Sequence, residues 1–392
     1  MAKQNTSHGG VFDQRQERTS KKTVLIMAAG TGGHVFPALS IAQTLMSKGV
    51  EIHWLGTAQG MENKLLASSQ VMIHPISVTG LRGMGIMRKL FSPIMIGIAV
   101  IQAMRIIARV KPGCVLGMGG FVSGPGGIAA KLLGKPLLIH EQNAVAGATN
   151  RILAKFANRI FEAFPNTFPE ASKVVHSGNP VRAEIVALHK RQNRSVERVA
   201  EDAVVELTPL RILVLGGSQG AGALNAVIPE VLAQWPGALG PQVLHQTGEK
   251  TLAETKRRYQ SLGLDSSEQY DVRAFIEDMA TAYAGADIVI CRSGASTVSE
   301  IAVVGLASIL VPYPHHSDQQ QTLNARWLSD CGAAHLLQQT ELNCESLGAL
   351  LQELDANREQ LNAMGERAES LAICNANDVI AAQCLEFSHV QS

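Results

Sequence analysis

Three glycine-rich segments of this chain each follow a short apolar run that is typical of a buried strand. GTGGH at 30–34 follows the run at 23–28, and GGSQG at 216–220 follows the run at 212–215. A glycine turn between a strand and a helix presents bare backbone N–H groups at the positive end of the helix, an arrangement that binds phosphate. These two turns therefore predict phosphate or pyrophosphate binding, with tight packing of the backbone as the alternative.

The third glycine segment, GMGGFVSGPGG at 117–127, is the densest. Ordering so many glycines costs conformational entropy, which predicts a second close approach of the backbone to a charged ligand. A flexible surface loop is the alternative. The residues that we expect to form this ligand loop are Gly119, Gly120, Ser123, Gly124, Gly126 and Gly127.

A fourth turn, RSGASTVSE at 292–300, follows an apolar run at 288–290. Ser296 or Thr297 is predicted to cap the next helix, whose free N–H groups suit a phosphate. Glu300 lies about one turn into that helix, where a carboxylate can accept from two ribose hydroxyls; complementing the helix dipole is the alternative. The glutamines at 319–321 are expected to begin a further helix, and a polar helix face explains them equally well.

Other phosphate-binding classes fit the sequence poorly. It contains no G-x-x-x-x-G-K-[ST] segment, which disfavours a P-loop nucleotidase. The GTGG turn is not a complete G-x-G-x-x-G, and the second apolar run ends in LGT at 55–57 without an acidic residue for a ribose, which disfavours NAD. We therefore predict no cofactor.

The sequence also lacks the signals of a metal site. It has no D-x-D segment, and no paired-ligand spacing connects the histidines near the candidate sites, which are His34, His140, His315 and His316. We expect no structural metal. A pyrophosphate must then be stabilised by helix amino termini and by a cation of the protein.

Composition excludes several classes of protein. Of 392 residues, 46% are hydrophobic and 17% are charged, which excludes a long disordered chain. Lys+Arg number 34 and Asp+Glu 33, and the net charge of +1 disfavours nucleic-acid binding. The six cysteines form no C-x-x-C pair and are expected to be reduced thiols of a cytosolic protein. Residues 1–21 have no apolar signal segment and are expected to form a disordered tail.

Apolar runs alternate with helical patterns, and this alternation restarts after a polar stretch. The pattern predicts βαβ units in two doubly wound, parallel-sheet α/β domains that face a cleft, with ligands at the carboxyl ends of the strands. We expect a first domain at 22–185, a linker at 186–208 and a second domain at 209–370. A helix within 371–392 is expected to pack back on the first domain.

Seven motifs follow one another along the chain: GTGGH at 30–34, the glycine segment at 117–127, HEQN at 140–143, GNPVR at 178–182, GGSQG at 216–220, FI at 275–276 and RSGASTVSE at 292–300. In this order they resemble the MurG family of bacterial N-acetylglucosaminyltransferases, over about residues 22–383. The resemblance implies a GT-B fold and transfer of GlcNAc from UDP-GlcNAc to lipid I (undecaprenyl-pyrophosphoryl-MurNAc-pentapeptide). It implies inversion to a β-1,4 linkage, with lipid II as product. Because no D-x-D is present, we expect transfer without a metal.

The resemblance also implies roles for individual residues. The helix start at 295–297 binds the donor pyrophosphate, Glu300 binds the ribose hydroxyls, and Arg182 neutralises pyrophosphate charge. The segment at 117–127 holds the acceptor diphosphate. The implied UDP-GlcNAc-binding residues are Thr31, Gly32, Gly33, Asn143, Arg182, Ser218 at the phosphates, Ile276 at the uracil through its backbone, Ala295, Ser296, Thr297, Val298, Ser299, Glu300, and Gln320 and Gln321 at the GlcNAc hydroxyls. Many family members carry Leu in place of Ser296, and the variable segment at 312–316 leaves the choice between the two glutamines open.

An inverting transfer needs a base for the muramyl 4-hydroxyl and forms no covalent enzyme intermediate. His34 is the first candidate, because it closes a glycine turn at the expected cleft and histidine titrates near neutral pH. Its alternative role is a hydrogen bond to the sugar or diphosphate, or a contact at the start of the helix. Glu141 is the second candidate, with an internal salt bridge or hydrogen bond as its alternative.

A lipid-linked acceptor requires contact with a bilayer. The segment at 90–104 is uncharged and mostly apolar, and it is bracketed by Arg88, Lys89, Arg105 and Arg109. It is shorter than the roughly 20 residues that span a membrane. We therefore expect an interfacial patch against anionic lipid on the cytoplasmic face of the inner membrane, with a buried core helix as the alternative. Cell-wall and division proteins are further candidate partners.

Two other functional classes stay open. A soluble GT-B enzyme, such as a UDP-GlcNAc 2-epimerase, needs neither a membrane patch nor a second diphosphate loop. The other class is a non-catalytic protein that binds a nucleotide sugar. The presence of His34, Arg182 and Glu300 argues against it.

Overall fold

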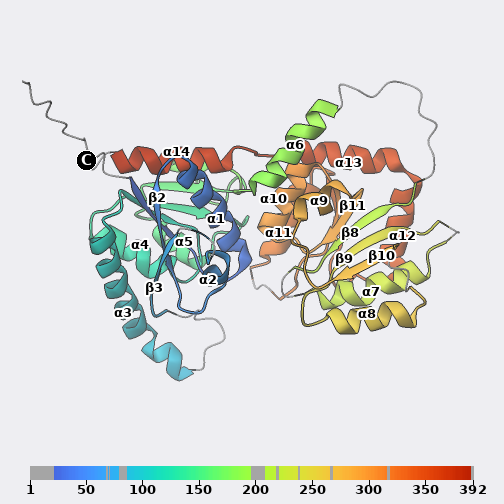
Figure 1. Ribbon diagram of the computed structural model, residues 1–392, viewed down its shortest axis with the longest axis horizontal. Helices are drawn as coiled ribbons and strands as arrows, with labels where there is room; N and C mark the ends of the chain where they lie inside the picture. Colours follow the sequence, from blue (N-terminus) through green and yellow to red (C-terminus); the bar gives the residue numbers. More distant parts are fainter. Residues whose placement is uncertain are drawn as a thin grey trace, which may run out of the picture.

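Each half of the chain folds around a parallel β-sheet whose strands are the short apolar runs of the sequence. The computed structural model describes residues 22–67, 69, 71–78, 86–195, 208–217, 220–236, 239–264, 268–315 and 318–389, and the two halves form α/β domains that lie side by side (Figure 1). Strand residues such as Leu25 and Ile290 are fully buried. Burial on both faces is typical of a parallel sheet that helices cover from two sides.

The first sheet has seven strands in the order β3-β2-β1-β4-β5-β6-β7. Its strands are β1 (Thr23–Met27), β2 (Glu51–Gly56), β3 (Met72–Pro75), β4 (Cys114–Gly117), β5 (Leu137–Glu141), β6 (Arg159–Glu162) and β7 (Val174–His176). The helices between them are α1 (Gly32–Ser47), α2 (Met61–Leu65), α3 (Ile86–Val110), α4 (Ser123–Leu132) and α5 (Ala148–Leu153).

The second sheet has six strands in the order β10-β9-β8-β11-β12-β13. Its strands are β8 (Arg211–Leu215), β9 (Gln242–Gln246), β10 (Tyr270–Arg273), β11 (Ile288–Cys291), β12 (Ala307–Leu310) and β13 (Ala334–Leu336). The helices are α7 (Gly222–Ala233), α8 (Leu252–Ser261), α9 (Met279–Ala284), α10 (Ala295–Val304), α11 (Gln320–Ser329), α12 (Cys344–Ala356) and α13 (Arg358–Ser370).

Both sheets repeat one winding scheme, which confirms the predicted fold class. Every strand pair among the described residues is parallel, and in each domain the chain winds outward from the first strand and then crosses to its other side. The strand order therefore reverses between β1 and β4 and again between β8 and β11. Ligands of doubly wound sheets bind at such reversal points, beyond the carboxyl ends of the strands.

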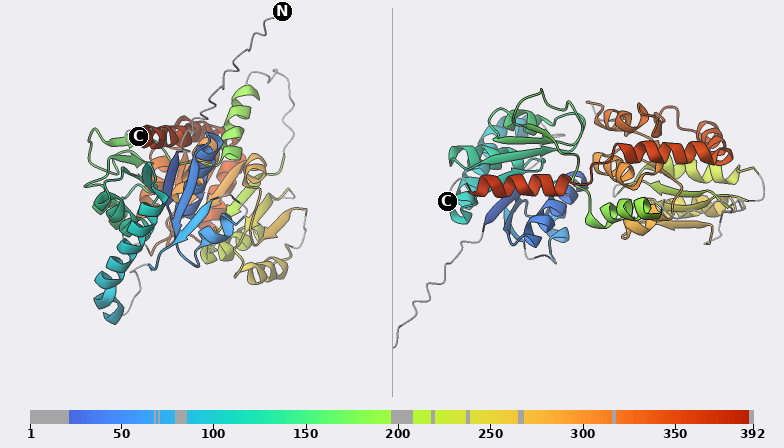
Figure 2. Two further views of the ribbon diagram at one scale, coloured as in Figure 1. Left: turned by 60° about the vertical axis from the view of Figure 1, so that its left-hand side comes forward. Right: turned by 90° about the horizontal axis from the view of Figure 1, so that it is seen from above.

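Two helices cross between the domains. Helix α6 (Ala183–Ser195) follows the first sheet but packs on α9 and α10 of the second domain. Helix α14 (Ala376–His389) follows the second domain and packs on α1, β1 and β4 of the first, where Ile380 and Cys384 are fully buried (Figure 2, right). The expected boundary at residue 185 and the expected linker at 186–208 therefore overlap α6, which belongs by its packing to the second domain.

Helix α3 is longer than the apolar segment that the sequence analysis singled out. Its window Pro93–Val110 is long and apolar enough to cross a membrane by length and composition alone. One side of the helix, with Ala99, Ala103 and Ile107, is fully buried and packs beside α4. The amino-terminal end of α3 projects beyond the rest of the domain (Figure 1).

Candidate active site

The strand order brings the first and third glycine segments together. Strands β1 and β4 are neighbours, with Met27 opposite Gly117. Gly30 and Gly120 have φ values of +103° and +75°, a region that favours glycine. A Cβ atom on Gly120 would lie 2.3 Å from the carbonyl oxygen of Ala29. Glycine is therefore required where the two segments touch.

Helix α1 begins at Gly32, inside the first glycine segment. Thr31 is its N-cap residue and makes no side-chain capping hydrogen bond, so the first helical turn is open to an anion. Thr31 and Gly33 are exposed. His34 lies in this turn, half-buried, with its Nδ1 3.0 Å from Oε1 of Gln142.

Much of the predicted ligand loop at 117–127 is helical, because α4 begins at Ser123. The buried Ser123 hydroxyl donates to backbone oxygens of Met27 and Gly119, so it is engaged inside the protein. A Cβ on Gly126 would meet the Met27 sulfur at 2.2 Å, and one on Gly127 would meet a Leu153 methyl carbon at 2.7 Å. These two glycines serve close helix packing. Of the predicted set, Gly119, Gly120 and Gly124 stay candidates for ligand contact.

The Glu141 carboxylate is engaged inside its own loop. It is 2% exposed, and its Oε1 accepts from the backbone and side-chain nitrogens of Asn143, each at 3.2 Å. Its Oε2 accepts from the Gly147 backbone at 3.0 Å and from Asn150 at 2.9 Å. This arrangement favours the internal hydrogen-bonding role over that of a catalytic base.

In the second domain, α10 begins at Ala295 with Gly294 as its N-cap residue and without a side-chain capping hydrogen bond. The prediction that Ser296 or Thr297 caps the helix was therefore wrong, because the N-cap is a glycine two residues before Ser296 and three before Thr297. The Ser296 Oγ is buried and has no hydrogen-bond partner among the described residues. An uncapped helix start with an unengaged hydroxyl is suited to an anionic ligand.

Two other residues predicted to bind the donor turn inward from α10. Val298 is fully buried in the core of the second domain. The Ser299 hydroxyl donates to the backbone oxygen of Ala295 and accepts from Asn179 at 3.0 Å. Asn179 also donates to the backbone oxygen of Gln142 at 3.1 Å, so it ties α10 to the loop that follows β5.

A second interdomain contact centres on Asn324, which is fully buried in α11. Its Oδ1 accepts from the backbone of Ala144 at 2.9 Å, and its Nδ2 donates to Asn143 Oδ1 and to the Ser293 carbonyl, each at 3.2 Å. The predicted Asn143 thus lies against the second domain. No role was predicted for Asn324 or Asn179, because spacing in the sequence does not reveal hydrogen bonds between domains.

Glu300 and Arg182 form an ion pair. The family resemblance had implied that Glu300 binds the ribose and Arg182 the pyrophosphate of the same ligand. Arg182 donates to Oε1 of Glu300 through Nη2 at 2.9 Å and Nε at 3.2 Å. The Tyr283 hydroxyl donates to Oε2 at 3.0 Å. Burial raises the pKa of Glu300, while the charge and hydrogen bonds of Arg182 and the Tyr283 hydrogen bond oppose that rise. Sequence analysis did not identify Tyr283 as a site residue, because in the sequence it is one position of a short, mostly apolar helix.

The other predicted donor residues are distributed around α11. Gln321 accepts the backbone N–H of Tyr313 through its Oε1 at 2.8 Å, so its carbonyl is engaged. Gln320 makes no side-chain hydrogen bond within the described residues, so its amide is available to a ligand. Ser218 lies outside the described residues.

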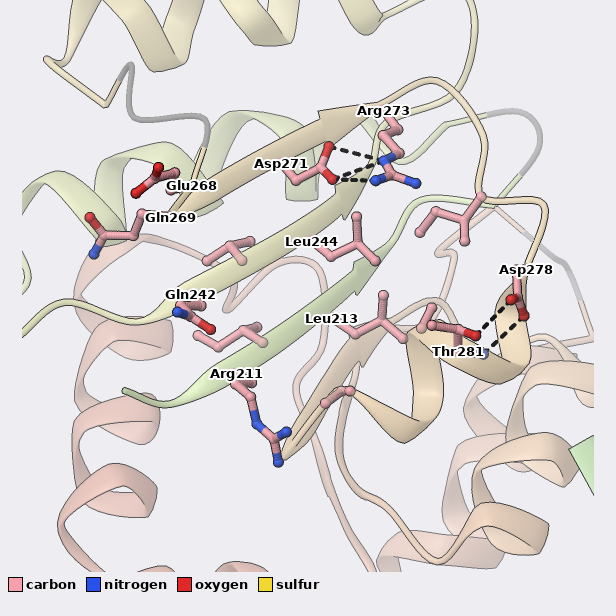
Figure 3. A pocket seen from close by; sticks show the side chains of 16 residues that line it. Arg211, Leu213, Gln242, Leu244, Glu268, Gln269, Asp271, Arg273, Asp278 and Thr281 are labelled. Carbon is pink, nitrogen blue, oxygen red and sulfur yellow. Dashed lines mark hydrogen bonds and ion pairs between the residues drawn. The ribbon is translucent and has the colours of Figure 1, made fainter. Parts of the chain in front are cut away.

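The structure also contains a groove of about 450 Å³ along the face of β8, β9 and β10 beside α9 (Figure 3). Its lining includes Leu213 and the ion-paired Asp271 and Arg273. Ile276 is buried beside it and donates its backbone N–H to Gln246 Oε1 at 3.1 Å. The groove borders Ile276, the predicted uracil contact. Its lining includes no residue of α1 or α10, so it lies apart from the groups at the domain interface.

Within the described parts of the chain, no group of three or more His, Cys, Asp or Glu side chains is arranged to hold a metal ion. Among the described residues, the positive groups at the domain interface include Arg182 and the amino-terminal ends of α1 and α10.

Comparisons with known proteins cover both domains. Residues 24–162 match the glycosyltransferase family 28 N-terminal domain, and residues 211–380 match the glycosyltransferase family 28 C-terminal domain. The chain is 46% identical over 366 residues to the UDP-N-acetylglucosamine–N-acetylmuramyl-(pentapeptide) pyrophosphoryl-undecaprenol N-acetylglucosamine transferase of Pseudomonas syringae pv. syringae, covering 93% of this chain and 99% of that protein.

Solved structures agree with the sequence match. The crystal structure of Acinetobacter baumannii MurG superposes with a TM-score of 0.76 and 42% identity, covering 93% of this chain and 99% of that one. UDP-GlcNAc 2-epimerase from Neisseria meningitidis, bound to UDP-GlcNAc, gives a TM-score of 0.62 at 14% identity, covering 93% of this chain and 100% of that one. At that identity the second likeness concerns the fold alone.

Proposed function

The chain belongs to the MurG family of N-acetylglucosaminyltransferases, and we propose that it transfers GlcNAc from UDP-GlcNAc to the muramyl 4-hydroxyl of lipid I, forming lipid II. It is a glycosyltransferase of family 28. The observation that carries the proposal is the contact between α1, which bears His34, and α10, which bears the uncapped helix start and Glu300. That contact places the helix that carries the proposed base against the helix that carries the proposed anion site, across the domain interface.

The proposed reaction is a single in-line displacement with inversion. The first turn of α10 and Ser296 bind the donor pyrophosphate, and Glu300 binds the ribose hydroxyls. His34 takes the proton of the muramyl hydroxyl while that oxygen attacks the anomeric carbon, and the carbon–oxygen bond to UDP breaks. The charge that develops on the leaving UDP is stabilised by the helix dipole and by Arg182, so we propose that no metal is required.

An assay of transfer in the presence of EDTA tests the proposal. Purified protein, labelled UDP-GlcNAc and a short-chain lipid I analogue are expected to give a labelled β-1,4-linked disaccharide at the same rate with and without EDTA. Nuclear magnetic resonance of the product reads the anomeric configuration. Epimerised sugar without disaccharide would support the epimerase reading, binding of UDP without turnover would support a binding protein, and loss of transfer in EDTA would refute metal independence.

We also propose that the enzyme is peripheral to the cytoplasmic face of the inner membrane and binds it through α3. Opposite its buried side, α3 exposes Ile94, Ile98 and Ile101 by 61%, 47% and 52%, at the spacing of one helical face. Arg105 and Arg109 continue that exposed side. An apolar helical face next to basic residues suits the interface of an anionic bilayer. Cell-wall and division proteins are proposed as partners on the family resemblance alone.

Replacing Ile98 by Asp is expected to lower binding to anionic vesicles by about tenfold or more, because burying one isoleucine contributes about 1.5–3 kcal/mol. The measurement is flotation with vesicles that contain acidic lipid, at low and high salt. Leu262→Asp, on the exposed end of α8 in the second domain, is the matched control and is expected to float like the wild type. If flotation is the same with Ile98→Asp, without acidic lipid and at high salt, the proposal that α3 binds the membrane is refuted.

A further inference from the structure

A chain of hydrogen bonds connects His34 to the interior of the first domain. It runs from the His34 ring to the Gln142 side chain at 3.0 Å, from Gln142 to the His140 ring at 3.0 Å, and from His140 to the Gly178 carbonyl at 3.0 Å. Gln142 and His140 are 1% and 0% exposed, so water does not compete for these bonds. The donor and the acceptor of each hydrogen bond can therefore be assigned in turn, starting from the buried His140.

The buried end of the chain is His140. A backbone carbonyl only accepts, so the His140 Nε2 that lies against the Gly178 oxygen carries a proton. Burial, with a smaller effect from the charge of His34, lowers the pKa of His140 to about 4, although the Gly178 hydrogen bond opposes this. The ring is therefore neutral at physiological pH. Its Nδ1 has a lone pair and accepts.

The orientation of the Gln142 amide follows. Its side-chain nitrogen lies 2.9 Å from the Met118 carbonyl oxygen and 3.0 Å from Nδ1 of His140, and both of these atoms accept. If the amide were turned over, its oxygen would face two acceptors without a proton between them. Both N–H bonds of Gln142 are thus used, and its Oε1 faces His34.

An amide oxygen only accepts, so the Nδ1 of His34 must donate to it. From this geometry we infer that Gln142 and His140 are positioning residues that hold His34 as the tautomer with its proton on Nδ1. The lone pair of the neutral ring is then on Nε2, which makes no hydrogen bond in the described parts of the chain. A general base needs such a lone pair, and the other tautomer would bury it against Gln142.

The third glycine segment also packs against the His34 ring. Gly119 has φ of +93°, and a Cβ there would lie 2.7 Å from Nδ1 of His34 and 2.8 Å from its Cε1. Any other residue at this position would push the ring from Gln142. The ring is therefore held on one side by a glycine contact and at Nδ1 by a hydrogen bond, while Nε2 stays available.

The role of Nε2 in the reaction rests on the proposed function, but the tautomer is a property of the free protein. Full-length chain labelled with ¹⁵N-histidine allows the protonated nitrogen of each ring to be identified by long-range ¹H–¹⁵N correlation at mildly alkaline pH. The His34 signals are assigned by their loss in His34→Gln. We expect the proton on Nδ1 of His34; a proton on Nε2, or the tautomer mixture of the urea-unfolded chain, would overturn the inference.

Gln142→Leu tests the positioning role in the reaction. We expect the His34 signals to shift toward a tautomer mixture, and kcat to fall by about 10- to 100-fold, the range seen when metal-ligating histidines lose the partner of their second nitrogen. UDP affinity is expected to be unchanged, which a general loss of structure would not allow. Gln234→Leu, at the exposed end of α7, is the matched control and is expected to behave as wild type.

The outcomes separate this inference from the proposed function. A folded Gln142→Leu protein that keeps the wild-type tautomer and kcat would overturn the positioning role. A wild-type protein with the Nδ1–H tautomer but without transfer would refute the proposed function while supporting the tautomer. If Gln142→Leu does not fold, the spectrum of the wild type still decides the assignment.

Discussion

Replacing His34 by alanine is expected to lower kcat by about 10²- to 10⁴-fold, the usual contribution of a positioned general base. The Michaelis constant for UDP-GlcNAc should change far less. The side chain is half-buried in the first turn of α1, its Nδ1 is bound to Gln142, and its Nε2 is the ring nitrogen left for the acceptor hydroxyl. Steady-state kinetics with a soluble lipid I analogue measure both constants, and UDP binding verifies that the variant is folded.

His34→Gln is the informative companion variant. A glutamine can still hydrogen-bond to a sugar or diphosphate oxygen, but it cannot accept a proton at neutral pH. If His34 acts as the base, the glutamine variant should be about as slow as alanine. If glutamine restores kcat, the hydrogen-bonding alternative is correct, and an unchanged kcat in both variants would remove His34 from the reaction.

The sequence was sufficient for the fold because its strongest signals are local. Uninterrupted apolar runs such as 212–215 predict strands buried on both faces, and a glycine turn after each first strand predicts the ligand edge. Once β1 and β4 are neighbours, the two glycine segments of the first domain must meet. These inferences need only the period of the pattern and the topology of a doubly wound sheet.

Inferences about what each polar side chain does were weaker, because they depend on partners distant in sequence. Arg182 and Glu300 are 118 positions apart, and neither spacing nor composition indicates that they pair. The glycines and proline at 117–127 predicted a loop, but tight packing of Gly126 on Met27 outweighs their poor helix propensity. Sequence analysis included Gln142 only as part of the HEQN motif and assigned it no role, because that role depends on hydrogen bonds to Met118 and His34.

Replacing Glu300 by alanine is expected to lower UDP affinity by about 100-fold or more and to destabilise the fold. A hydrogen bond to a charged group contributes about 1.5–3 kcal/mol, and the carboxylate is proposed to hold two ribose hydroxyls. The Glu300 and Arg182 side chains are 12% and 25% exposed, so the variant leaves a guanidinium largely buried without its partner. Breaking such a pair costs about 3–5 kcal/mol. Calorimetric titration with UDP and thermal unfolding measure the two effects separately.

Two comparisons distinguish ribose binding from a purely structural ion pair. Wild-type protein should bind 2′-deoxy-UDP about 10- to 100-fold more weakly than UDP, because one charged hydrogen bond is lost, whereas Glu300→Ala should bind both alike. The double variant Arg182→Leu, Glu300→Ala removes the unpaired guanidinium and should recover part of the lost stability without recovering UDP affinity. If wild type and Glu300→Ala discriminate equally between the two nucleotides, Glu300 does not contact the ribose, and its role is to hold Arg182 and Tyr283 in place.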